Sequence, residues 1–152
     1  MTTTPPSGVY PNQGDDKTPK RGTIYLAGPM RGLPEFNFPA FMAADKHLRA
    51  IGWDVRNPAV KDTEDGLDVN GTHGQDHELE QQGFDMREAI TWDLNAITWE
   101  CDAIALLPGW KGSSGSKAEL ALARFLNIDV YEYDRSSSNG LRALQRVVTL
   151  DV

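Results

Sequence analysis

Short apolar segments alternate with helical segments along most of the chain, and this alternation is the strongest constraint on its fold. The expected strands are short, rich in apolar or β-branched residues, and end at turn residues. They cover residues 23–27, 53–56, 103–107 and 129–133. The helices between them have apolar residues at helical spacing and cover residues 38–51, 84–100 and 117–126. This order predicts a parallel sheet with helices on both faces.

Glycine-containing loops follow two of the expected strands. Residues 28–32 follow the first strand, and residues 109–116 follow the third. In open parallel sheets, ligands bind at the carboxyl ends of the strands. We therefore expect these two loops to form a ligand site together.

Three segments lie outside the alternation. Residues 1–22 have no apolar period, so we expect a flexible leader. Residues 61–84 are acidic and glycine-dotted, which predicts a long loop able to act as a lid. Residues 135–152 form a tail, with a serine-rich linker and an expected helix over 141–148. The expected domain spans residues 23–134.

Composition narrows the classes of partner. The chain has 152 residues and a net charge of -7, which argues against binding duplex nucleic acid. No apolar run approaches the ~20 residues of a membrane helix, and the first residues lack the apolar core of a signal peptide. The single cysteine, Cys101, fits a reducing compartment. We therefore expect a cytoplasmic protein that binds a small molecule or another protein.

The first loop could bind an anion. Gly28 and Gly32 allow the backbone to approach a ligand closely, and Arg31 between them offers several donors to a phosphate or carboxylate. A plain strand-to-helix turn with a surface arginine explains the same residues. Spacing alone does not separate the two interpretations.

The second loop places hydroxyls and a glycine at the start of a helix: Ser113, Ser114, Gly115 and Ser116. Free backbone N–H groups and the helix dipole favour an anion at such a position. Ordinary N-capping needs only one serine. Glu119 is then either the capping-box partner of Ser116 or a catalytic carboxylate.

Other polar residues give weaker signals. Asp93 and Asp102 flank the expected junction between the second helix and the third strand, where Arg87 could pair with either acid. His73 and His77 are four residues apart, but the glycines around them argue against the helix that a metal site would need. No metal or cofactor is expected.

The chain also resembles a phage and bacterial family that is similar to nucleoside 2-deoxyribosyltransferases. The resemblance extends from about residue 23 to residue 133. It is carried by residues 25–32, 37–41, 57–59, 93–94, 101–104 and 107–110, together with Ser114, Gly115 and Glu119. Related groups exchange bases between deoxynucleosides or hydrolyse (deoxy)nucleoside 5′-monophosphates at the N-glycosidic bond. The implied fold is a three-layer Rossmann/flavodoxin-like sandwich with a mostly parallel sheet of four to five strands.

This resemblance implies roles for individual residues. Glu119 matches a glutamate nucleophile that forms a glycosyl-enzyme intermediate, and it favours the catalytic interpretation of that residue. Asp93, with Asp102 behind it, is the expected second acid. Tyr25 is expected to orient Glu119 or line the sugar pocket, and Trp110 to stack on the base.

The remaining matched residues form the expected substrate- and phosphate-binding set. They are Gly28, Met30, Arg31, Gly32, Asn37, Ser113, Ser114, Gly115 and Ser116, and Asp102 and Trp110 also belong to this set. Pro29 stands where related hydrolases carry a serine, which removes one hydroxyl and one N–H donor. The implied substrate is a nucleotide or nucleoside in a bacterial or phage-infected cell, and the implied assembly is a homodimer or larger. The alternative is a non-catalytic module that binds or sequesters a nucleotide.

Overall fold

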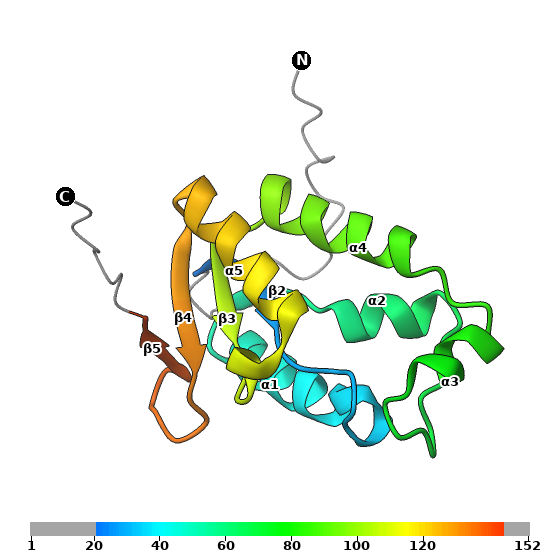
Figure 1. Ribbon diagram of the computed structural model, residues 1–152. Helices are drawn as coiled ribbons and strands as arrows, with labels where there is room; N and C mark the ends of the chain where they lie inside the picture. Colours follow the sequence, from blue (N-terminus) through cyan, green and yellow to red (C-terminus); the bar gives the residue numbers. More distant parts are fainter. Residues whose placement is uncertain (1–20, 145–152) are drawn as a thin grey trace, which may run out of the picture.

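A five-stranded sheet forms the centre of the computed structural model, which describes residues 21–144 (Figure 1). The strands lie in the order β2-β1-β3-β4-β5. The first four are parallel to one another, and β5 pairs with β4 in the antiparallel direction. The strands are β1 (Gly22–Ala27), β2 (Trp53–Arg56), β3 (Ala103–Leu106), β4 (Asp129–Tyr133) and β5 (Leu141–Ala143). The expected α/β sandwich with a mostly parallel sheet is confirmed.

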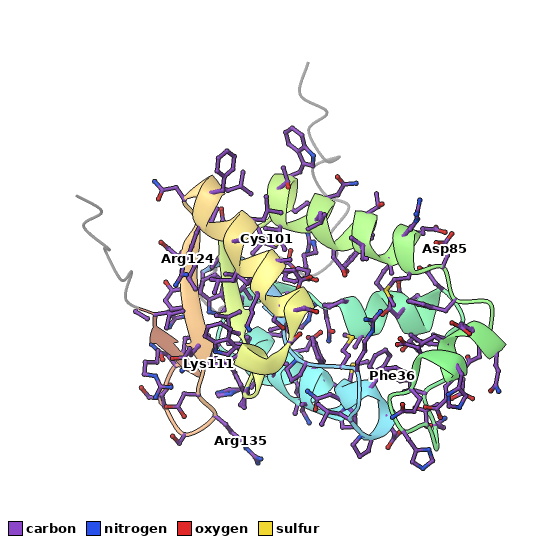
Figure 2. The ribbon with its side chains drawn as sticks, viewed as in Figure 1. Phe36, Asp85, Cys101, Lys111, Arg124 and Arg135 are labelled. Atoms are coloured by element: carbon purple, nitrogen blue, oxygen red, sulfur yellow. The ribbon has the colours of Figure 1, made fainter. Side chains whose placement is uncertain are left out.

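Five α-helices and three shorter helical segments connect the strands. The α-helices are α1 (Phe38–Ala50), α2 (Pro58–Glu64), α3 (Asp76–Gln81), α4 (Met86–Asn95) and α5 (Ser114–Leu126). The shorter segments are the 3-10 turns η1 (Pro34–Asn37) and η3 (Trp110–Gly112), and the π-helix η2 (Ala96–Glu100) that continues α4. Asp85, at the start of α4, caps this helix by accepting the backbone N–H of Glu88 at 3.1 Å (Figure 2). Among the described residues, no helix has the length and apolarity needed to cross a membrane.

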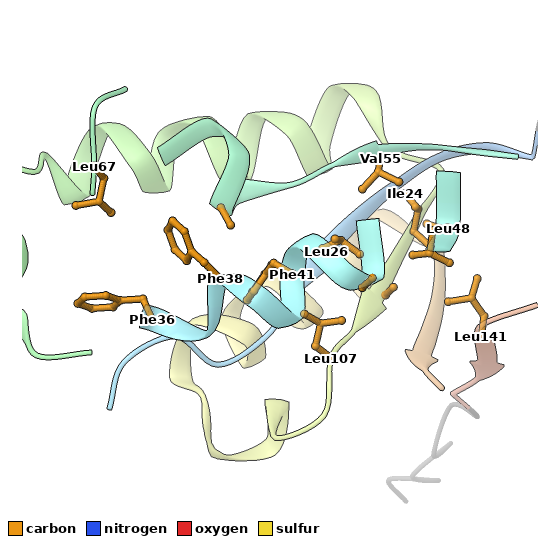
Figure 3. Packing of buried hydrophobic residues seen from close by; sticks show 14 of the residues in the cluster. Ile24, Leu26, Phe36, Phe38, Phe41, Leu48, Val55, Leu67, Leu107 and Leu141 are labelled. Carbon is orange, nitrogen blue, oxygen red and sulfur yellow. The ribbon is translucent and has the colours of Figure 1, made fainter. Parts of the chain in front are cut away.

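Apolar side chains cover both faces of the sheet because successive strand residues point in opposite directions. On one face, Ile24 and Leu26 of β1 pack with Phe38, Phe41 and Leu48 of α1 (Figure 3). The other face carries a second cluster of buried residues from β1, β3, η2 and α5. Its members are Tyr25, Ala27, Ala96, Ile97, Cys101, Ile104, Leu106, Leu120 and Ala123. These two clusters define the three layers.

Two expectations outside the central strands are wrong. Residues 61–84 contain the end of α2 and all of α3 rather than one long loop. The described part of the expected helix over 141–148 is the edge strand β5. The sheet therefore extends beyond the expected domain boundary at residue 134. The remaining residues of that helix, and residues 1–20 of the expected leader, lie outside the described residues.

The segment between α2 and α3 is attached to the loop that follows β1. The Gly32 N–H donates to the Gly74 carbonyl at 2.8 Å, and the Glu35 N–H donates to the Thr72 carbonyl at 3.0 Å. Gly74 has a φ of +79°, and a Cβ at this position would lie 2.5 Å from the backbone nitrogen of Leu33. Glycine is therefore required at Gly74 by both conformation and space.

We expect Gly74→Ala to lower the free energy of unfolding by about 2–4 kcal/mol, because it combines left-handed strain with a backbone clash. Gly71→Ala is the matched control. Gly71 also has a positive φ, +71°, but nothing lies within 4 Å of an added Cβ. We expect Gly71→Ala to lower the free energy of unfolding by about 1 kcal/mol. Urea unfolding followed by circular dichroism measures both, and equal losses would contradict the close-approach argument.

Candidate active site

A cavity of about 550 Å³ opens at the carboxyl end of β1. β1 lies between β2 and β3, so the chain crosses from β1 to one side and later returns to the other. Such a reversal of strand order leaves a crevice that the crossover connections do not cover. Gly28, directly after β1, lines this cavity, and a Cβ there would lie 2.8 Å from the Cβ of Leu107. Glycine thus lets the chain turn closely past β3 into the pocket.

The centre of the pocket is a hydrogen bond between Tyr25 of β1 and Glu119 of α5. The Tyr25 hydroxyl donates to Glu119 Oε2 at 2.5 Å. Tyr25 is only 1% exposed, so its orientation is fixed by packing in the second apolar cluster. Burial and the neighbouring acids Glu119 and Asp93 raise the pKa of Tyr25 well above its usual value, so it remains a donor. Tyr25 therefore positions the Glu119 carboxyl towards the cavity.

Three carboxyl groups line the same cavity: Asp62 of α2, Asp93 of α4 and Glu119 of α5. Burial raises the pKa of Glu119 to about 8, although the Tyr25 hydrogen bond opposes this shift. Burial likewise raises the pKa of Asp93 to about 7, again against an interaction with Tyr25. Asp62 is 6% exposed, and its pKa is raised to about 7 by burial and by Asp93. The cluster therefore exchanges protons near neutral pH.

The serine loop forms the wall of the pocket beside Glu119. Ser113 is the N-cap of α5: its hydroxyl accepts the Ser116 N–H at 3.1 Å and the Ser116 hydroxyl at 3.0 Å. The first turn of a helix has backbone N–H groups without intrahelical partners, here those of Ser114 and Gly115. All four residues line the cavity. Because Ser113 is the cap, the capping-box interpretation of Glu119 with Ser116 is wrong.

Arg31 reaches the same pocket from the loop after β1. Its side chain is largely exposed and pairs with Asp76 at the start of α3, with 3.2 Å between Arg31 Nε and Asp76 Oδ1. Met30 lines the pocket beside it. The loop is held in place by Asn37, whose side-chain amide donates to the Pro29 carbonyl at 2.9 Å. Arg31 and the serine loop thus place a cation and free N–H donors at one cavity.

The side of the cavity away from α5 is apolar. In Figure 1, α5 and α3 lie on opposite sides of α2. Residues of all three helices line the pocket. Phe36, labelled in Figure 2, belongs to this apolar side, as do aromatic and aliphatic residues from several elements. They are Phe36, Phe38, Phe41, Leu67, Leu79, Phe84, Met86 and Ile90. Such a surface suits a flat, weakly polar ring.

Several residues expected in the site lie elsewhere. Asp102 precedes β3, so it lies at the amino edge of the sheet, where its carboxylate accepts the Thr23 N–H at 2.9 Å. Trp110 does not line the cavity; its indole N–H donates to Glu132 at 3.1 Å. Gly32 and Asn37 also lie outside the lining and act on the loop itself. The expected binding roles of Asp102 and Trp110 are therefore wrong for this cavity.

Helix α4 presents two apolar side chains to the cavity. Ile97, in the π-helix that continues α4, is buried in the core, whereas Ile90 and Leu94 are not. Ile90 and Leu94 are 46% and 37% exposed and line the cavity instead.

Cys101 is a buried, free thiol, and burial raises its pKa to about 12, so the thiol is inert at neutral pH. In the part of the chain that the structure describes, no group of three or more His, Cys, Asp or Glu residues could hold a metal ion.

A family model described as a domain of unknown function, DUF4406, matches residues 22–132. The chain belongs to the DUF4406 family. The match runs from β1 into β4 and includes every residue that lines the cavity, whereas β5 lies beyond it. Comparison with curated proteins finds no match.

The carboxyl cluster predicts how stability depends on pH. The native pKa values of Asp62, Asp93 and Glu119 exceed those of an unfolded chain, about 4, so the native state binds more protons between about pH 4 and 8. Stability should therefore fall as pH rises through this range. We expect Asp62→Asn to be more stable than the wild type by about 1–3 kcal/mol at pH 8.5 and equal to it near pH 4.

Thermal melts between pH 4 and 9 measure this difference. Glu64→Gln, an exposed carboxyl on the same helix, is the matched control and should follow the wild-type curve. A wild-type and an Asp62→Asn curve that stay parallel over the whole range would contradict the placement of a buried, protonated Asp62.

Proposed function

We propose that this DUF4406 protein cleaves or exchanges the N-glycosidic bond of a (deoxy)nucleoside 5′-monophosphate or (deoxy)nucleoside. The single observation that carries the proposal is the Glu119 carboxyl, held by the Tyr25 hydroxyl at 2.5 Å in a cavity shared with a second acid, Asp93. Paired carboxyl groups suit reactions that pass through an oxocarbenium-like transition state. One carboxylate stabilises the sugar cation, and the other acid serves the leaving group.

In the proposed reaction, ionised Glu119 attacks the anomeric carbon C1′ of the sugar. A bond forms between C1′ and a Glu119 oxygen while the C1′–N bond breaks, and its electron pair leaves with the base. Neutral Asp93 supplies the proton that the base takes up. Water, or an acceptor base in the exchange reaction, then attacks C1′ and releases Glu119. Asp93 recovers its proton from this attacking group, so the cycle closes.

The cavity also supports a phosphate at the 5′ position. The first-turn N–H groups of Ser114 and Gly115 suit an anion, and Arg31 lines the same cavity. Arg31 is engaged with Asp76, so a phosphate competes with that carboxylate for the guanidinium. The apolar side of the cavity accommodates the base. A monophosphate therefore fits the distribution of polar and apolar residues better than an uncharged nucleoside.

One observation favours the alternative, a non-catalytic nucleotide-binding module. With a pKa of about 8, Glu119 is mostly protonated at pH 7 in the empty pocket, and a neutral acid is a poor nucleophile. A module of this kind would bind nucleotides and be stabilised by them without turnover. An assay for release of free base distinguishes the enzyme from the non-catalytic module.

We expect the protein to release free base from one or more members of a panel of nucleosides and 5′-monophosphates, assayed by chromatography with and without an acceptor base. Glu119→Gln should lower the rate about 10³-fold or more, because it removes the nucleophile. Glu80→Gln, an exposed carboxyl on α3, is the control and should keep wild-type activity. Binding without release of base from any member of the panel would favour the non-catalytic module.

The pH profile of the reaction tests the roles of Asp93 and Tyr25. The active state has Glu119 ionised and Asp93 neutral, which is a minority state because Glu119 has the higher pKa. Its population is flat between about pH 7 and 8 and falls on both sides. Tyr25→Phe removes the hydroxyl that stabilises both ionised Glu119 and ionised Asp93, so the pKa of each acid should rise. We expect the whole profile to move to higher pH, with the rate at pH 7 lowered about 5- to 10-fold.

Initial rates between pH 5 and 10 measure this shift. A Tyr25→Phe profile with unchanged limbs would show that the tyrosine does not act through the ionisation of Glu119. Melting curves of the variant distinguish this result from partial unfolding.

A further inference from the structure

Asp62 is a buried acid that the proposed reaction does not use. It lies in α2 and is 6% exposed, yet among residues 21–144 its carboxyl makes no hydrogen bond and no ion pair. The neighbouring cation is engaged elsewhere, since Lys61 Nζ bonds both oxygens of Asp65 at 2.7 and 2.8 Å. Among the described residues, every side-chain oxygen or nitrogen that is sealed from solvent has a hydrogen-bond partner. Because the Asp62 carboxyl has no such partner, it must be open to solvent, and it opens into the cavity that it lines.

The position of Asp62 within the cavity is defined by its neighbours. Asp62 interacts electrostatically with Asp93, and Asp93 interacts with Tyr25 and Glu119. Asp62 and Asp93 line the cavity from α2 and α4, whereas Glu119 lines it from α5, so Asp62 lies on the side formed by α2 and α4. Leu67 is its neighbour, since the Leu67 N–H donates to the Asp62 carbonyl at 3.0 Å, and the apolar side chains of Leu67 and Phe84 line the same cavity. A base attached to C1′ at Glu119 would extend towards this side.

We infer that Asp62 binds the leaving base as a neutral carboxylic acid, pairing with an edge that carries an exocyclic amino group beside a ring nitrogen, as in cytosine and adenine. This inference rests on the proposed function and names its substrate class. A neutral carboxylic acid has one O–H donor and one carbonyl acceptor side by side. The ring nitrogen accepts a hydrogen bond from the O–H of the acid, and the amino group donates one to its carbonyl oxygen.

Surroundings keep Asp62 neutral when the base is bound. Its charged neighbours are Asp93 from α4, and Asp65 and Lys61 from α2, so acids outnumber the single cation. Burial already raises the pKa of Asp62 to about 7, and a bound base removes more water from the carboxyl. Protonated acid is then the dominant form in the complex at neutral pH.

The edge with an amino group is favoured over one with an oxo group because of where the proton can reside. A ring nitrogen next to an amino group is basic, so both hydrogen bonds persist whether the proton stays on Asp62 or moves to the ring. An oxo oxygen is not basic, so its pairing lasts only while the acid is neutral. Unpaired polar groups in a buried site are costly, which turns this difference into selectivity.

Binding measured without turnover tests the inference. In a Glu119→Gln background, isothermal titration compares 2′-deoxycytidine and 2′-deoxyuridine 5′-monophosphates, which differ at this edge. At pH 6 we expect the cytosine nucleotide to bind about tenfold or more tightly. Adding Asp62→Leu should weaken binding of the cytosine nucleotide by about 10- to 100-fold and remove the preference for cytosine over uracil. Adding Asp62→Asn, whose amide also offers a donor beside an acceptor, should preserve binding.

The dependence on pH separates recognition by a protonated acid from a merely structural role. Between pH 6 and 8.5 the Asp62 protein should lose affinity about tenfold or more relative to its Asp62→Asn counterpart, whose amide does not titrate. Asp93 remains in both proteins, so its contribution cancels in this ratio. Glu64→Gln is the control for a charge change on α2.

The outcomes are distinct. The inference is overturned if the Asp62→Leu protein binds the cytosine nucleotide as tightly as its parent does. It is also overturned if the Asp62→Asn protein melts normally but binds as poorly as the Asp62→Leu protein. A preference for uracil, or none, overturns the assigned edge. If base release depends on Glu119 while the Asp62 variants bind normally, only the inference fails. If the Glu119→Gln parent binds no nucleotide and the wild type releases no base, the proposed function fails as well.

Discussion

The site depends on the central position of β1, which pairs in parallel with β2 on one side and β3 on the other. Parallel pairing on both sides forces the crossover connections apart and opens a crevice at the carboxyl end of β1. α5, which follows β3, packs against β1 from the opposite direction to α1. Tyr25 and Glu119, 94 residues apart in sequence, meet for this reason. The topology therefore determines the chemistry available in the pocket.

The central strands and α1 could be predicted from sequence because their signals are local. Apolar runs bounded by glycine, proline and asparagine define β1 to β4, and helical spacing defines α1. The failures involve weak local signals or distant pairing. α3 begins with Gln75, an unusual N-cap, and is stabilised by Glu78, whose carboxylate accepts the N–H groups of Gln75 and His73. β5 is defined only by its pairing with β4, which no local pattern reveals.

The candidate site was predictable where a residue follows a strand or matches a motif. Arg31 and the serine loop follow strands and do reach the cavity. Asp102 precedes a strand, and the same topological rule places it at the opposite edge, where it caps Thr23. The helix that carries Asp62 could also have been predicted, but its segment was interpreted as a loop because it is acidic. Asn57 and Pro58 begin a short helix, and Ala59 and Asp62 fall on its buried face.

The gathering of Asp62, Asp93 and Glu119 opposes folding, since burial disfavours the charged form of each carboxyl. Apolar clusters on both faces of the sheet provide the favourable free energy that offsets this cost. An acid that is costly to ionise is a ready proton donor at neutral pH, whereas an exposed carboxylate is not. The feature that weakens the fold at alkaline pH is therefore the one that suits the pocket to the proposed reaction, in which the leaving base needs a proton.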